Sequence, residues 1–150
     1  VQAKESMTPE YKAYQQSVLD NAAALADELK KSGLRLISNG TSTHLVLVDV
    51  RELIPSGKQA EDVLASVGIV TNKNMIPFDP QSANVASGLR LGSPALTTRG
   101  FEEEDIRHTA RLLAKALKNY QDEAILEEIK GEVKELAGKF PMFADKWLAR

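Results

Sequence analysis

The stretch "SGLRLGSPA", residues 87–95, predicts the strand on which the rest of the fold is built. Alternation places Leu89 and Leu91 on one face of that strand and Arg90 on the other. The glycines on both sides allow another backbone or a ligand to come close. Two interpretations of the arginine stay open: it faces water from an edge strand, or it reaches into a site and grips an anion with its planar guanidinium.

A long helix is expected near the start of the chain. Thr8 followed by Pro9 is typical of an N-cap with proline at the first helical position. Gly33, after two lysines, indicates where the helix ends. The apolar residues between these signals recur at helical spacing and form one stripe: Tyr11, Tyr14, Val18, Ala22, Leu25 and Leu29.

Two strands are expected after this helix. Residues 34–38 and 44–50 are rich in β-branched and aliphatic side chains, as strands are. The dipeptide Asn39-Gly40 between them is typical of a hairpin turn. Because residues 45–48 are apolar on both faces, we expect the second strand to be central and covered on both sides.

Three further helices are predicted, beginning at Ser56, near the acidic cluster 102–105 and at Asp122. Between the first two of these helices, residues 72–86 have no clear period and contain two prolines. A structureless segment of that length is often functional, although a plain surface loop is the alternative. Trp147, in the tail, is expected to dock on this domain or on a partner.

The order of these elements predicts an α/β chain, more narrowly an α+β domain with helices on one side of a small sheet. A chain of 150 residues suffices for one domain with a hydrophobic core, so residues 1–150 are expected to form a single domain. The chain begins with Val1, and we expect it to be a piece of a longer polypeptide.

Composition narrows the function classes. A formal net charge of −2 without a basic stripe argues against a nucleic-acid partner. There is no cysteine, and the two histidines are far apart in sequence, so neither disulfides nor a metal site is expected. No apolar run is long enough to span a bilayer and no signal peptide is visible, which favours no membrane association and a cytoplasmic location.

The residues alone offer few candidates for chemistry. His44 is interpreted as a structural histidine at the start of a strand, and His108 as a solvated residue of a charged helix. Lys73 could form a Schiff base, but a lone lysine in a loop is usually just solvated. Arg90 is the best single candidate, because a desolvated pair with a carboxylate contributes roughly 1.5–3 kcal/mol.

Four motifs in order resemble one known family. They are "YKAYQQSVLDNAAALADEL" (11–29), "HLVLVDV" (44–50), "TNKNMIPFDP" (71–80) and "SGLRLGSPALTTRGF" (87–101). Together they resemble the C-terminal part of serine hydroxymethyltransferase over nearly the whole chain. That family consists of pyridoxal-phosphate enzymes of the aminotransferase-like class (fold type I), which interconvert serine and glycine while passing a one-carbon unit to tetrahydrofolate.

The resemblance implies a fold, partners and site residues. It implies a C-terminal small domain with helices on a small, mainly antiparallel sheet, beside a large pyridoxal-phosphate domain of the same polypeptide. It also implies a parent enzyme that is a homodimer or higher oligomer. Within the motifs, Arg90 is implied to bind the carboxylate of the amino acid, and Asn74 to contact the folate.

The family's Schiff-base lysine follows a histidine, and no His-Lys pair exists here. Since the chemistry requires that lysine, the chain alone is predicted to be inactive and to contain no catalytic residue of its own. Two alternatives stay open. One is a free-standing, non-catalytic binding or assembly module. The other is a small domain of another enzyme of the same cofactor class, against which the Asn-Lys-Asn and Thr-Thr-Arg-Gly-Phe segments argue.

Overall fold

A computed structural model describes residues 2–141, with the backbone only for residues 2 and 3. The expected docking of Trp147 therefore lies outside the described residues. The chain begins with a short helix that the sequence analysis did not anticipate, α1 (Gln2–Glu5), followed by the long helix α2 (Pro9–Lys31). The predicted start of α2 is confirmed, because the Thr8 hydroxyl accepts the amide of Tyr11 at 3.2 Å.

The four strands form one antiparallel sheet. They are β1 (Arg35–Leu36), β2 (Leu45–Asp49), β3 (Asn72–Asn74) and β4 (Gly88–Gly92). Their order across the sheet is β1-β2-β4-β3, so β2 and β4 are the interior strands. The prediction of strands at these two places is confirmed. Of the two interpretations of Arg90, the one that places it on an edge strand is wrong, because β3 pairs with the outer side of β4.

The predicted hairpin between residues 34–38 and 44–50 is wrong in detail. Only Arg35 and Leu36 pair with β2, and the chain then turns into a short 3-10 helix, Ile37–Asn39, in which two residues have positive φ angles. The hydroxyl of Thr41 donates to the carbonyl of Leu45 at 2.6 Å. This hydroxyl takes the place of a strand partner, and the connection becomes a wide loop.

Part of the segment predicted to be irregular is a strand. Residues 72–74 form β3 and pair with residues 88–90 of β4. Three polar residues carry no apolar alternation, so sequence periodicity could not find this strand. Its pairing depends on β4, which lies 14 residues or more further along the chain.

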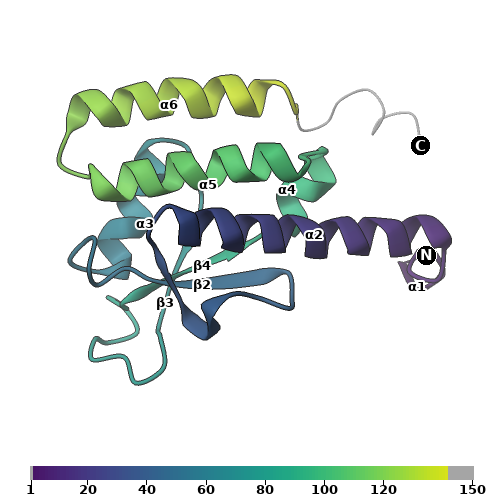
Figure 1. The fold of residues 1–150 in the computed structure, drawn as a ribbon, viewed down its shortest axis with the longest axis horizontal. Helices are drawn as coiled ribbons and strands as arrows, with labels where there is room; N and C mark the ends of the chain where they lie inside the picture. The colour runs from purple at the N-terminus through teal and green to yellow at the C-terminus, as the bar shows by residue number, and fades with distance from the viewer. Residues whose placement is uncertain (1, 142–150) are drawn as a thin grey trace.

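The remaining helices are α3 (Gly57–Ser66), α4 (Pro94–Arg99), α5 (Glu103–Lys118) and α6 (Glu123–Gly138). The sequence predicts α3, α5 and α6, but its pattern gave no prediction of the short α4. The helices lie on one side of the sheet, with α6 farthest from the strands (Figure 1). The α+β class is thereby confirmed. None of the helices within residues 2–141 is long and apolar enough to cross a membrane.

The core lies between the sheet and the helices. Alternate residues of the two interior strands point into it and are buried, namely Val46, Val48, Leu89 and Leu91. The opposite face is open in this chain, where Leu45 retains 39% of its exposure and Leu47 is half-buried. The prediction that residues 45–48 are covered on both sides is therefore wrong for the outer face.

Candidate functional site

Arg90 lies at the middle of the open face. In the strand register it stands opposite Leu47 of β2 on one side and Asn72 of β3 on the other. Its chain neighbours Leu89 and Leu91 point into the core, so the alternation expected from the sequence is confirmed. Arg90 is exposed, and it belongs to an interior strand that is hydrogen-bonded to β2 on one side and to β3 on the other.

Arg90 also differs from the other arginines in its lack of partners. It is the one arginine within residues 2–141 that forms neither a hydrogen bond nor an ion pair with the described chain. Every other arginine in that range is held by a carboxylate or by main-chain carbonyls: Arg35, Arg51, Arg99, Arg107 and Arg111. An arginine that has five donors and no internal partner is available for an external anion.

A cavity of about 380 Å³ adjoins this guanidinium. Arg90 and Asn74 both contribute to its wall, so the structure brings together the two site residues that the sequence analysis named. The rest of the wall comes from β2 and the loop before it: Ile37, Ser38, Gly40, Thr41, Ser42, Thr43, Leu45, Val46 and Leu47. The wall thus combines apolar side chains with hydroxyl, amide and guanidinium groups that can orient a small polar ligand.

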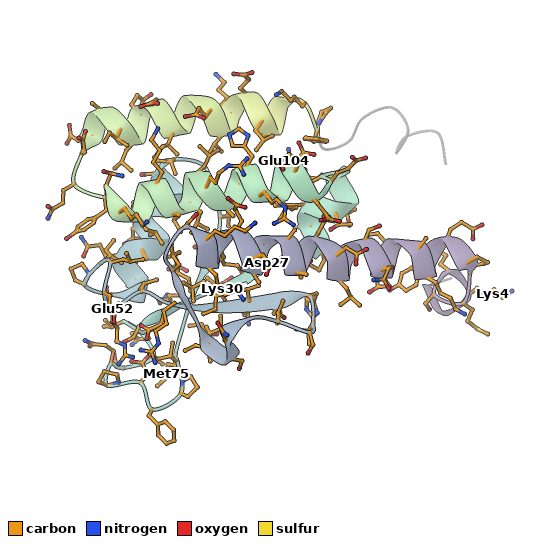
Figure 2. All side chains as sticks on the ribbon, viewed as in Figure 1. Lys4, Asp27, Lys30, Glu52, Met75 and Glu104 are labelled. Atoms are coloured by element: carbon orange, nitrogen blue, oxygen red, sulfur yellow. The ribbon has the colours of Figure 1, made fainter. Side chains whose placement is uncertain are left out.

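Asn74 is the last residue of β3. Its side-chain amide donates to the carbonyl of Met75 at 2.7 Å, which fixes the orientation of the amide group. Met75 itself is 44% exposed. In Figure 2 it lies on the opposite side of the molecule from α5, the helix beside which Glu104 is labelled. The side-chain oxygen of Asn74 thus remains available for a donor from a ligand.

Lys73 lies on the opposite face from Arg90 and Asn74. Its backbone amide donates to Oε1 of Glu61 at 3.1 Å, and its Nζ lies 3.3 Å from Oε2 of the same residue. The backbone hydrogen bond, assisted by the lysine ammonium, lowers the pKa of Glu61 below its usual value of 4.5. Lys73 is therefore a structural link between β3 and α3 and does not line the cavity.

A second charged group lies at the end of β2 on the open face. Asp49 is buried, and Arg51 holds it with both its Nε and its Nη2, the latter at 2.7 Å. Arg35 adds an ion pair at 3.2 Å. The hydrogen bonds from the Arg51 side chain lower the pKa of Asp49, which keeps this carboxylate ionised. Because Asp49 is neutralised by its own arginines, it does not compete for Arg90.

The two histidines take no part in the cavity. His44 is exposed, and its backbone carbonyl accepts the amide of Ser93 at 3.2 Å. The Nε2 of His108 lies 3.6 Å from a carboxylate oxygen of Glu132 on α6, which fits its interpretation as a surface residue. No cluster of three or more metal-ligating side chains occurs among the described residues.

The sequence analysis missed the contribution of residues 37–43 to the cavity. The Thr41 hydroxyl accepts the amide of Thr43 at 3.0 Å, and the Thr43 hydroxyl accepts the amide of Leu45 at 3.2 Å. These bonds shape the wall next to Arg90. The run "NGTST" was a usable signal, because hydroxyl side chains so close together favour local hydrogen bonds over a regular hairpin.

Comparison with known proteins gives the same family as the motifs. The family model described as serine hydroxymethyltransferase matches residues 1–113. The serine hydroxymethyltransferase of Myxococcus xanthus (strain DK1622) is 51% identical over 143 residues, which are 95% of this chain and 34% of that protein. That of Herminiimonas arsenicoxydans is 51% identical over 140 residues, 93% of this chain and again 34% of the relative.

The chain thus spans about a third of the length of the curated relatives it matches. Such coverage agrees with the expectation of a part of a longer polypeptide. At this level of identity over nearly all of the chain, the chain belongs to the serine hydroxymethyltransferase family.

Proposed function

We propose that the chain is the C-terminal small domain of a serine hydroxymethyltransferase and that its open face supplies part of the substrate site. In the complete enzyme, serine and glycine are interconverted and a one-carbon unit passes to tetrahydrofolate. The observation that carries the proposal is the unpaired guanidinium of Arg90 in the wall of the same cavity as Asn74.

Arg90 is proposed to bind the carboxylate of serine or glycine. A guanidinium presents two parallel donors that match the two oxygens of a carboxylate, which fixes both the position and the orientation of a small amino acid. The neighbouring strands β2 and β3 hold the backbone of Arg90 on both sides, so only its side chain loses conformational freedom when the ligand binds.

Asn74 is proposed to contact the folate. An amide side chain can both donate and accept, as the polar edge of a pterin ring requires. Since Arg90 and Asn74 share one cavity wall, the amino acid and the folate would be held next to each other. Transfer of a one-carbon unit between two substrates needs that proximity.

Pyridoxal phosphate is the cofactor that the family implies, and the residues present do not fit it. No lysine lines the cavity, and Lys73 of the motif pairs with Glu61 on the opposite face. We therefore propose that the large domain of the same polypeptide holds the cofactor and that this chain alone is inactive. The proposal extends to a cytoplasmic parent enzyme that is a homodimer or higher oligomer.

The test replaces Arg90 in the complete polypeptide that contains this chain. Arg90→Ala is expected to raise the KM for serine roughly ten- to hundredfold, as the loss of a charge-assisted pair of 1.5–3 kcal/mol implies. Arg90→Lys should recover only part of the loss, because lysine lacks the planar fork. Arg111→Ala, on the helical side, is the control and should leave the KM unchanged. An unchanged KM in Arg90→Ala would refute the proposal.

A further inference from the structure

The segment between the two site residues is organised around one carboxylate. Asp79 lies five residues after Asn74 and eleven before Arg90. Its Oδ2 accepts the amides of Ile76 at 3.0 Å and Ser87 at 2.9 Å. Its Oδ1 accepts the amide of Gln81 at 2.9 Å and the hydroxyl of Ser87 at 2.6 Å. A single side chain thus joins the residue two after Asn74 to the residue three before Arg90.

The charge state of Asp79 fits this structural role. Burial alone would raise its pKa, but the hydroxyl of Ser87 and the three amides outweigh that effect and lower the pKa to about 2. The carboxylate is therefore ionised at any pH at which the protein works, and all four of its hydrogen bonds are charge-assisted.

The C-terminal end of this segment, at Ser87 and Gly88, is tightly packed. Ser87 is 1% exposed, and its carbonyl accepts the amide of Val50 at 3.0 Å. A Cβ on Gly88 would lie 2.7 Å from Cγ2 of Ile76 and 2.9 Å from the carbonyl oxygen of Asn74. The close contact of Gly88 with Ile76 and Asn74 thus depends on the turn that Asp79 ties together.

Asn74 and Arg90 depend on Asp79 to different degrees. Arg90 is held by β2 and β3 on both sides of its own strand. Asn74 ends the edge strand β3, pairs on one side only with Gly88, and continues directly into the segment. Loosening the segment would therefore displace Asn74 more than Arg90.

We propose that Asp79 is a positioning residue for the folate side of the site, which acts by fixing Asn74 relative to Arg90. This inference rests on the proposed function, because it assigns a role to Asp79 through the folate contact of Asn74. Asp79 does not line the cavity, so it is assigned no direct contact with either substrate.

The test compares substitutions in the complete polypeptide. Asp79→Asn keeps the size of the side chain but turns an amide NH₂ toward donors, so part of the cluster is lost. The KM for tetrahydrofolate is expected to rise about tenfold or more, as misplacement of a binding group implies. The KM for serine should change less than about threefold, since Arg90 keeps its ladder. Ser87→Ala removes one of the four hydrogen bonds. It should also raise the KM for tetrahydrofolate more than the KM for serine, a split between the two KM values in the same direction but smaller than that of Asp79→Asn.

Two controls make the outcome decisive. A purely structural role would lower the folded fraction and the apparent kcat while leaving both KM values alone, and this result would overturn the inference. An equal rise in both KM values would overturn it as well. Asp62→Asn, an exposed partner of Lys58 on α3, should change neither KM.

The proposed function is tested separately by Arg90→Ala. If Arg90→Ala raises the KM for serine and Asp79→Asn produces no split, the role of Asp79 fails alone. If Arg90→Ala has no effect, the proposed function fails first. Should Asp79→Asn not fold, Ser87→Ala decides by the presence or absence of the split.

Discussion

The two faces of the sheet have different compositions although the same strands build both. On the covered face, Val48 and Leu89 are 0% exposed and pack under the helices. On the open face, the same strands present Leu47, Arg90 and the partly exposed Leu45. The residues that the two interior strands turn to the covered face are apolar and buried, whereas the open face carries an arginine without a partner among residues 2–141.

The contrast separates stability from binding. Burial of apolar surface against the helices holds the fold together. A guanidinium that stays exposed to water adds little to stability, because water hydrates it about equally well in the folded and in the unfolded chain. Neighbouring residues of one strand should therefore respond oppositely to mutation, one in stability and the other in ligand binding.

The largest effect on stability is expected from a substitution of Leu89, and Arg90 is the residue with which it is compared. Leu89→Ala removes a fully buried side chain and should lower the free energy of unfolding by about 2–5 kcal/mol. Arg90→Ala, one residue away, should change it by less than about 0.5 kcal/mol. Chemical denaturation of the full chain measures both. A large loss of stability in Arg90→Ala would break the distinction between the faces.

A smaller loss of stability is expected at Gly88, where the neighbouring strands β2 and β3 lie too close for a side chain. An alanine here would place its Cβ 2.9 Å from the carbonyl oxygens of Asn74 and Val48, so Gly88→Ala should cost about 1–3 kcal/mol. Gly131→Ala is the matched control. Nothing lies within 4 Å of its added Cβ in α6, and removing a helical glycine should stabilise by about 1 kcal/mol. Thermal or chemical denaturation that gave both variants the same sign would contradict this account.

The smallest effect concerns Lys73, the cation on the covered side. Lys73→Met removes a partly exposed ion pair with Glu61 and should cost about 0.2–1 kcal/mol near neutral pH. The pKa of Glu61 is lowered in the folded chain, so its contribution is present above the usual value of 4.5 and is lost as the pH falls through the lowered value. The difference between variant and parent should thus vanish in acid. Denaturation curves at neutral and acidic pH test this, and a difference that grew in acid would refute it.

The last prediction tests the proposal that this chain does not hold pyridoxal phosphate by itself. Mixed with pyridoxal phosphate and then reduced with borohydride, the chain should show no stoichiometric attachment to any one lysine by mass spectrometry. Lys73, held by Glu61 on the covered side, is the residue most relevant to this test. A single fully labelled lysine would show that the chain can hold the cofactor by itself.

Local patterns predicted much of the fold. The cap at Thr8 and the stripe that follows it defined α2, and the alternation around Arg90 gave the correct face for that residue. Local patterns also failed at particular places. The strand Asn72–Asn74 has no apolar alternation, and the pairing of residues 34–38 is cut short by the hydroxyls of Thr41 and Thr43.

By itself, the sequence determined the helices α2, α3, α5 and α6, the positions of the two interior strands, the family and the two candidate site residues, because caps, periodicity and motifs are properties of adjacent residues. Only the tertiary structure decided that Arg90 has no partner among the described residues, that Asn74 shares its cavity and that Lys73 lies on the other face. Those facts depend on β3 pairing with β4 and on α3 packing against both strands. Contacts between distant segments cannot be read from local spacing.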